Sequence, residues 1–333
     1  MRFLEPRSRS KHNVLIGLML AGIVGCAHRD RTSGVPPAFA SSSTTIVAAG
    51  DIACDPNSDF FNQGLGTPGH CQMKATSDLV LSMHPAAVLA LGDEQYEQGT
   101  TASFERSFDP SWGRFKQLIH PVPGNHEYWT ADAKGYFDYF GSAAGPKGLG
   151  YYSFDIGGWH IIALNSNCDH VQGCGEGSAQ QQWLVHDLKE HSGHCTLAYW
   201  HNARFSSGLH GSDSHYQAFW HALYDAGADL ILVGHDHDYE RFAPLDSLGR
   251  LDQKAGIREF VVGTGGKNRR GFTSGIPFSG RRGRYSEFRD SSTFGVLELS
   301  LADKAYAWRF VTPSNEVRDF GAGTCHLTQH AQP

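Results

Sequence analysis

Short apolar runs alternate with segments whose apolar residues recur at helical spacing, so strands and helices are predicted in turn. Strands are predicted at 45–50, 86–91, 195–200 and 229–233, and a hairpin at 150–164 around two glycines. Helices are predicted at 72–83, from the N-cap residue Ser178 to Glu190, and at 215–226 before Gly227. Because the last third consists mainly of strand-like runs, this order predicts an α/β domain with a strand-rich C-terminal part.

Side chains that bind metal ions directly follow five of the apolar runs. They are Asp51 after IVAAG, Asp93 after VLALG, Asn125 after PVPG, His201 after TLAYW, and His235 with His237 after LILVG. In open α/β sheets, ligands bind beyond the carboxyl ends of the strands, so we expect these residues at one shared site. Carboxylate, amide and imidazole ligands together indicate a centre for two metal ions, with the Asp93 carboxylate as the bridge. The glycine that precedes most of these residues leaves room around the ions.

Composition and charge narrow the possible classes of protein. The chain has 333 residues, of which 40% are hydrophobic and 19% charged, a globular composition. No interior linker is visible, so residues 44–330 are predicted to form a single catalytic domain. The formal net charge of −6 argues against general nucleic-acid binding. A negatively charged substrate would need local cations, which bound metal ions supply.

The N-terminal residues have the features of an export signal. Basic residues before position 14 precede the apolar run 14–24, which is too short for a comfortable membrane span. The sequence Ile23-Val24-Gly25-Cys26 resembles the cleavage motif of bacterial lipoproteins. The prediction is a signal peptide at 1–25, a flexible tether at 26–43 and attachment to the membrane through a lipid on Cys26. An ordinary secretory signal cut nearby is the alternative. Both predict export, and the first places the protein in the periplasm or at the cell surface.

Six cysteines remain when Cys26 is set aside: Cys54, Cys71, Cys168, Cys174, Cys195 and Cys325. An even number of cysteines in an exported protein indicates disulfides. The sequence leaves the pairing open, although proximity favours Cys54–Cys71 and Cys168–Cys174, which leaves Cys195–Cys325. A thiolate zinc site is the less favoured alternative because the chain has no CxxC pair.

The motifs GD, GDxxY, GNHE, a later isolated histidine and GHxH follow one another between about residues 45 and 245. This ordered set resembles the calcineurin-like metallophosphoesterase superfamily and, within it, the purple acid phosphatase branch. The resemblance implies a four-layer α/β/β/α sandwich with two mixed β-sheets. It also implies two metal sites that share Asp93. The first would hold Asp51, Asp93, Tyr96 and His237, and the second Asp93, Asn125, His201 and His235.

Two positions favour the purple acid phosphatase branch over the wider superfamily. Many members carry a histidine two residues after the first aspartate, where this chain has Ala53, which cannot coordinate a metal. Tyr96 instead matches the tyrosinate ligand of purple acid phosphatases. The resemblance therefore implies Fe³⁺ in the first site and Zn²⁺, Fe²⁺ or Mn²⁺ in the second. An ordinary half-buried tyrosine is the alternative interpretation of Tyr96.

Further residues are expected to contact the substrate. The resemblance implies that Asn125 and His126 face it, with His126 assisting departure of the leaving oxygen, and that His210 stabilises the phosphoryl group. Arg204 is either a phosphate contact or a structural arginine. Asn202-Ala203 stands where a His-Pro pair is expected in bacterial relatives. The last candidate is a basic, glycine-rich loop that either rims the site and attracts anions or is simply solvated; its residues are Lys267, Arg269, Arg270, Arg281, Arg282 and Arg284.

The expected function is hydrolysis of a phosphoric ester by a metal-bound hydroxide. Our first hypothesis is an acid-phosphatase-like phosphomonoesterase that acts on small phosphorylated substrates. One alternative is a phosphodiesterase that acts on cyclic nucleotides, nucleic acid or phospholipid headgroups. Another is a catalytically silent lipoprotein that binds metal or phosphate. The motif GxSxG is absent from the sequence, so nothing indicates a serine nucleophile.

Overall fold

The computed structural model describes residues 43–272 and 284–326, all of which lie in one compact unit, Pro36–Pro333. The predicted signal peptide at 1–25, the lipidated Cys26 and all but the last residue of the predicted tether at 26–43 lie outside the described residues, as do Arg281 and Arg282 of the basic loop. Within the described residues, no helix combines the length and the apolar character needed to cross a membrane.

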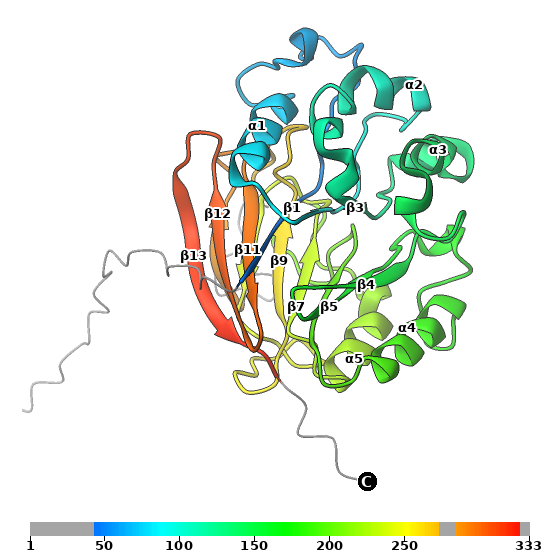
Figure 1. Cartoon of the computed structure of the whole chain (residues 1–333), viewed down its shortest axis with the longest axis vertical. Coiled ribbons are helices and arrows are strands. Elements are labelled where there is room, and N and C mark those ends of the chain that lie inside the picture. The colour runs from blue at the N-terminus through cyan, green and yellow to red at the C-terminus, as the bar shows by residue number, and fades with distance from the viewer. Residues whose placement is uncertain (1–42, 273–283, 327–333) are drawn as a thin grey trace, which may run out of the picture. The chain divides into compact units, whose positions relative to one another are not determined.

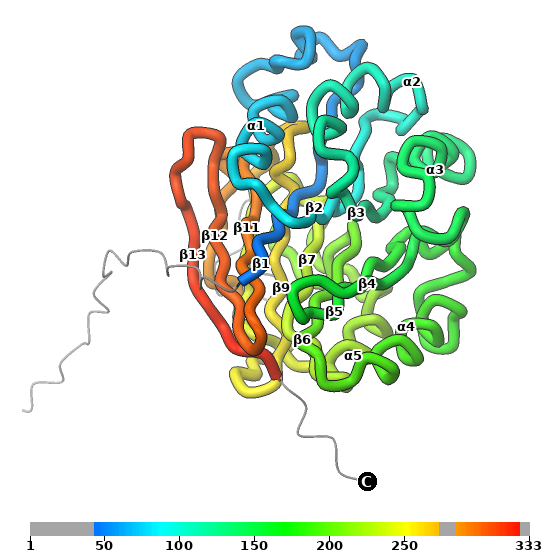
Figure 2. Tube along the Cα trace, viewed as in Figure 1, coloured from blue at the N-terminus to red at the C-terminus, as the bar shows by residue number. Residues whose placement is uncertain are grey.

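The first β-sheet has six strands in the order β13-β12-β11-β1-β2-β3 (Figure 2). Their bounds are β1 Thr44–Ala49, β2 Ala87–Ala90, β3 Ile119–Pro121, β11 Val296–Ala302, β12 Ala305–Val311 and β13 Val317–Thr324. The first three strands run parallel to one another, whereas β11, β12 and β13 form an antiparallel meander that joins β1. The strand-rich C-terminal part predicted from the sequence thus completes the sheet that β1 begins.

The second β-sheet has seven strands in the order β10-β8-β9-β7-β6-β5-β4. Their bounds are β4 Tyr152–Ile156, β5 Trp159–Ala163, β6 Cys195–Tyr199, β7 Leu230–Val233, β8 Tyr239–Phe242, β9 Arg258–Val262 and β10 Ser286–Asp290. Strands β5, β6, β7 and β9 are parallel, and the remaining strands pair antiparallel to them or to each other. Both sheets are therefore mixed, as the resemblance implies.

Alternate residues of the central strands face two different layers. In β7, Leu230 and Leu232 join the core that also holds the six-stranded sheet, whereas Ile231 and Val233 join a second core. Helices α4 (Ala179–Glu190) and α5 (Gln217–Asp225) lie side by side (Figure 1). They supply Leu184 and other apolar side chains to that second core. Strands buried on both faces read as continuous apolar runs, which explains the sequence pattern.

The remaining α-helices are α1 (Met73–Met83), α2 (Thr101–Ser103) and α3 (Lys134–Phe140). Helices α1 and α3 supply buried side chains to the core that holds the six-stranded sheet, and the short α2 contacts α3. On α1, Met73, Thr76 and Val80 are buried, as predicted, and Met83 packs against the same core. With α4 and α5 on the other sheet, the predicted four-layer α/β/β/α arrangement is confirmed.

Local predictions also agree with the structure. The Ser178 hydroxyl accepts a hydrogen bond from the backbone N–H of Gln181 and so caps α4 as expected. The helix predicted at 215–226 is preceded by a short 3₁₀ turn and begins as an α-helix only at Gln217. Three disulfides join Cys54 to Cys71, Cys168 to Cys174 and Cys195 to Cys325, which is the pairing that proximity favours.

Candidate metal centre

Tight turns after three strands place the predicted metal ligands. Asp51 after β1, Asp93 after β2 and His235 after β7 all adopt left-handed backbone conformations, with φ of 58°, 50° and 69°. Such conformations are uncommon for residues other than glycine, and they cluster at functional sites. They turn the chain sharply, so that each side chain points back across the strand ends.

Glycines next to the ligands are required by close approach. A Cβ atom on Gly92 would lie 2.6 Å from Nδ1 of His201, and one on Gly124 would collide with the Asp93 carboxylate. No larger residue fits at either position without moving a predicted ligand. The space that these glycines leave open is therefore filled by the side chains of other predicted ligands, His201 beside Gly92 and Asp93 beside Gly124.

The hydroxyl of Tyr96 lies within hydrogen-bond distance of three other predicted ligands, Asp51, Asp93 and His237. The Tyr96 hydroxyl lies 2.7 Å from Asp51 Oδ1, 2.7 Å from Asp93 Oδ2 and 3.1 Å from His237 Nε2. Tyr96 is only 1% exposed, so it is fully buried rather than half-buried. These are the four residues that the resemblance assigns to the first metal site.

The second predicted group surrounds His201. Its Nε2 atom lies 3.2 Å from Asn125 Oδ1, 3.2 Å from His235 Nδ1 and 3.4 Å from Asp93 Oδ1. Asp93 thus faces both groups, through Oδ2 toward Tyr96 and Oδ1 toward His201. A carboxylate with one oxygen in each group has the arrangement that a bridging ligand needs.

Two of the histidines are oriented through their second ring nitrogen. Nδ1 of His201 lies 2.8 Å from the carbonyl oxygen of Leu91, and Nδ1 of His237 lies 2.9 Å from the side-chain oxygen of Asn268. An Nδ1–H group that donates to these oxygens leaves the Nε2 lone pair free for a metal ion. Both Nε2 atoms face the carboxylates of the cluster, so the donor set fits two cations.

The electrostatic environment of the predicted metal ligands favours positive charge among them. Burial would raise the pKa of Asp51, but His237 lowers it below its usual value. Burial opposes a charge on His201, but the Asp93 carboxylate raises its pKa to about 10. Burial and the two carboxylates raise the pKa of Tyr96 well above its usual value. A tyrosinate ligand therefore requires a cation strong enough to displace the phenolic proton.

His126 lies at the edge of this cluster. Its Nδ1 atom lies 2.6 Å from the carbonyl oxygen of Glu97, and its Nε2 atom lies 3.9 Å from Asp93 Oδ2. The ring packs between Tyr96 and Trp129, with ring centroids 4.3 Å and 4.2 Å away. The imidazole is thus fixed with Nε2 directed toward the site, next to an exposed tryptophan.

His210 also reaches the cluster, from the loop after β6. Its ring lies 4.1 Å from the ring of His235, and its backbone N–H donates to the buried carboxylate of Asp236 at 2.8 Å. Glu240 holds the same loop by accepting hydrogen bonds from the backbone and hydroxyl of Ser207. Glu240, which follows the GHxH motif, thus helps to hold the loop that carries His210.

Arg204 lies on the same loop but is directed elsewhere. Its guanidinium donates to the side-chain oxygen of Gln217 on α5 and lies over the ring of Phe205. Its backbone N–H donates to the buried carboxylate of Glu259. These contacts favour the structural interpretation of Arg204 over a phosphate contact.

Sequence reasoning missed the role of Glu127. This fully buried carboxylate accepts hydrogen bonds from the backbone N–H groups of Asp93, Gln95 and Gly124, at 3.0, 3.1 and 2.8 Å. It therefore ties the turn after β2 to the loop that carries Asn125. The only available signal was its place in the GNHE motif, which does not show which donors it meets.

A second cluster of histidine and aspartate lies away from these residues. Both ring nitrogens of the buried His160 lie 2.8 Å from carboxylate oxygens, of Asp155 and Asp187. The ring of His191 stacks on that of His160 at 3.8 Å, with an angle of 10° between them. Nitrogen lone pairs in parallel rings do not converge on one ion, so this cluster ties β4 and β5 to α4 through hydrogen bonds and charge.

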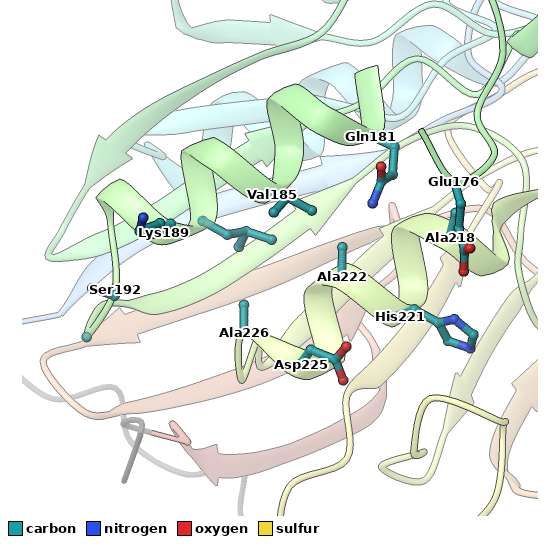
Figure 3. A pocket seen from close by; sticks show the side chains of 12 residues that line it. Glu176, Gln181, Val185, Lys189, Ser192, Ala218, His221, Ala222, Asp225 and Ala226 are labelled. Atoms are coloured by element: carbon teal, nitrogen blue, oxygen red, sulfur yellow. The ribbon is translucent and has the colours of Figure 1, made fainter. Parts of the chain in front are cut away.

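Two pockets lie near these elements. A polar pocket of about 290 Å³ opens beside Asn125 and is lined by Asn167, Asp169 and Asn202 among others. A larger pocket of about 680 Å³ lies between α4 and α5 (Figure 3). The larger pocket shares no lining residue with the predicted ligands, whereas the smaller one is lined by Asn125 and so adjoins the candidate centre.

Comparison with protein families decides the classification. The model of the calcineurin-like phosphoesterase family matches residues 44–239, more than half of the chain. The chain belongs to the calcineurin-like phosphoesterase family. The matched range contains all seven predicted metal ligands, together with His126 and His210.

Within the calcineurin-like phosphoesterase family, the chain is similar to purple acid phosphatases. Among curated proteins, it is 29% identical to probable purple acid phosphatase 20 of Arabidopsis thaliana over 243 residues. This alignment covers 65% of the present chain and 54% of the plant protein. The chain thus spans about half the length of the first curated relatives it matches. The activity of those longer proteins is therefore not transferred by the match itself.

Solved structures share the fold. A purple acid phosphatase from yellow lupin seeds superposes with a TM-score of 0.66 at 17% identity, over 86% of this chain and 55% of that chain. A dimetal phosphatase from Danio rerio gives a TM-score of 0.58 at 14% identity, over 85% of this chain and 99% of that one. At these identities the likeness concerns the fold alone.

Proposed function

We propose that the protein is an acid-phosphatase-like phosphomonoesterase with two metal ions. The observation that carries this proposal is the convergence of seven predicted donor side chains from both sheets, within about 3.4 Å of a neighbouring donor. Membership of the calcineurin-like phosphoesterase family supports hydrolysis of a phosphoric ester. The similarity to purple acid phosphatases supports a monoester substrate.

In this proposal the ligands divide as the resemblance implies. Asp51, Asp93, Tyr96 and His237 hold Fe³⁺, because a phenolate and two carboxylates suit a hard trivalent ion. Asp93, Asn125, His201 and His235 hold Zn²⁺, Fe²⁺ or Mn²⁺. When bound, such ions supply a hydroxide nucleophile near neutral pH and offset the negative charge of the phosphoryl group.

The histidines at the edge of the cluster would act on the substrate. The carbonyl oxygen of Glu97 keeps Nδ1 of His126 occupied, so Nε2 is the atom that can protonate the leaving oxygen. His210, beside His235, is placed to donate to a phosphoryl oxygen. Asn125 would contact the substrate as well as the second ion. The polar pocket beside Asn125 would receive the leaving group.

Asp93→Ala is the decisive variant. Loss of the carboxylate that faces both groups of ligands, around Tyr96 and around His201, should lower the amount of metal bound per protein and at the same time abolish hydrolysis of 4-nitrophenyl phosphate. Asp303→Ala removes an exposed carboxylate between β11 and β12 and serves as the matched control, with full activity expected. Turnover retained in Asp93→Ala would refute the two-metal proposal. A visible spectrum of the purified protein tests the tyrosinate–Fe³⁺ assignment, since a colourless, iron-free but active enzyme would contradict it.

We also propose that the protein is exported and anchored through Cys26. Three disulfides support an oxidising compartment, because such bonds are rare in the cytosol. The lipid anchor rests on the sequence pattern alone. Cys26→Ser should release the protein from the membrane fraction, and an unchanged distribution would exclude lipidation at this position.

A further inference from the structure

Arg270, after β9, lies against two histidines of the candidate centre. Its backbone N–H donates to the carbonyl oxygen of His237 at 3.0 Å, which fixes its main chain beside the first predicted metal site. Its guanidinium Nη1 lies 2.9 Å from Nε2 of His210. The His210 ring in turn lies 4.1 Å from the ring of His235. The main chain of Arg270 therefore lies beside the first predicted metal site, and its guanidinium lies against the histidine that contacts His235 of the second.

The charge of Arg270 is not balanced by a carboxylate. Across residues 43–272 and 284–326, its side-chain partner is the imidazole of His210, and no carboxylate lies within ion-pair distance. Several arginines elsewhere in the second half of the chain do pair with carboxylates, among them Arg241, Arg258, Arg309 and Arg318. Since an arginine does not lose its proton in proteins, a full positive charge remains beside the candidate centre.

The neighbouring arginine shows that this placement is specific. Arg269 is exposed, and its Nη1 donates to the backbone oxygen of Ser292. Its guanidinium lies over the ring of Phe294, with 5.7 Å to the ring centroid. Of these two adjacent arginines, only Arg270 contacts a histidine of the centre, although both belong to the same basic run of sequence.

We propose that Arg270 binds an anionic oxygen of the substrate's phosphoryl group and so makes the site selective for dianionic monoesters over monoanionic diesters. This inference rests on the proposed function, whose substrate preference it explains. The planar guanidinium matches the spacing of phosphoryl oxygens, and a hydrogen bond between two charged groups is stronger than one between neutral groups. A monoester presents one more anionic oxygen than a diester, so an added cation attracts it more strongly.

The test compares Arg270→Ala with Arg269→Ala as the matched control. Inorganic phosphate is titrated into each metal-loaded protein by calorimetry, and kcat/KM is measured for 4-nitrophenyl phosphate and for bis(4-nitrophenyl) phosphate. Arg270→Ala should weaken phosphate binding about 10- to 100-fold, the range expected for the loss of a charge-assisted hydrogen bond. It should lower kcat/KM for the monoester about tenfold more than for the diester. Arg270→Lys keeps the positive charge but loses the planar, two-pronged guanidinium, so its phosphate affinity and kcat/KM should lie between those of the unaltered protein and Arg270→Ala.

Several outcomes would overturn the inference. One is phosphate affinity in Arg270→Ala equal to that of Arg269→Ala, and another is an equal loss of activity on both esters. Metal content is measured in each variant, because a loss of metal in Arg270→Ala would show a structural role instead. If the unaltered protein hydrolyses neither ester, the proposed function fails. The phosphate titration then still decides whether Arg270 binds the anion.

Discussion

Replacing Glu127 by alanine is expected to destabilise the protein and loosen its metal centre at the same time. The carboxylate is fully buried and accepts three backbone hydrogen bonds, from Asp93, Gln95 and Gly124. A buried donor left without a partner costs about 1–3 kcal/mol, so three of them cost on the order of 3–9 kcal/mol before relaxation or entry of water. We expect a net loss of about 3–5 kcal/mol in the free energy of unfolding, at the high end for a single substitution.

The effect on metal binding follows from where those donors are. Two of the three N–H groups belong to Asp93 and to Gly124, the residue before Asn125. Residues that orient metal ligands typically change affinity or activity by about 10- to 100-fold when they are replaced. Glu127→Gln keeps one side-chain oxygen and should lose less, about 1–3 kcal/mol, because one of the three donors then faces an NH₂ group.

The assay combines urea unfolding with metal analysis and kcat on 4-nitrophenyl phosphate. Asp229→Ala is the matched control, because this buried carboxylate also accepts backbone hydrogen bonds, from Thr196 at 2.9 Å and His326 at 2.6 Å, but lies outside the predicted ligand set. It should lower stability while its folded fraction keeps its metal and activity. Glu127→Ala with the stability and metal content of the unaltered protein would refute this reasoning, and so would an equal loss of metal in both variants.

Three further outcomes are expected. Burial lowers the pKa of His160, but its two carboxylate partners raise it above its usual value. The contribution of charged His160 to the free energy of unfolding is therefore full below about pH 6.5, the pKa in the unfolded chain, and is lost as pH rises through the higher pKa of the folded protein. The difference in unfolding free energy between the protein and His160→Gln should thus be larger at pH 5 than at pH 9, and a constant difference would contradict a charged His160. Tyr96→Phe should lose the visible absorption band and its iron, measured by spectroscopy and metal analysis; an unchanged band would exclude Tyr96 as a ligand. Replacing both Cys195 and Cys325 by alanine should cost about 2–5 kcal/mol in urea unfolding with little change in kcat, whereas unchanged stability would show that this disulfide contributes nothing.

The positions of the strands and helices and the candidate metal ligands were accessible from short-range patterns of the sequence, whereas the four-layer arrangement of two sheets was implied by the family resemblance. A strand buried on both faces appears as an unbroken apolar run, and β7 with its LILV sequence is an example. A ligand that follows such a run lies at the carboxyl end of its strand, as Asp51 and Asp93 do in the six-stranded sheet and His235 does in the seven-stranded sheet. That the ends of two different sheets meet at one site does not follow from the apolar runs themselves. The cysteine pairing was favoured by proximity for two bridges, and the third followed because two cysteines remained.

The residues whose roles the sequence missed, as for Glu127, or left open, as for Arg270, act through contacts between distant segments. Glu127 meets the backbone of Asp93, 34 positions away, and Arg270 meets His210, 60 positions away. Neither contact follows from periodicity or from a motif, since a backbone donor has no sequence signature and a basic run is compatible with full solvation. The sequence left Arg204 open between a phosphate contact and a structural role, and the hydrogen bond from its guanidinium to Gln217 on α5 favours the structural role. Local patterns therefore predict which atoms can bind the ions, and only the tertiary contacts decide which charges remain free for the substrate.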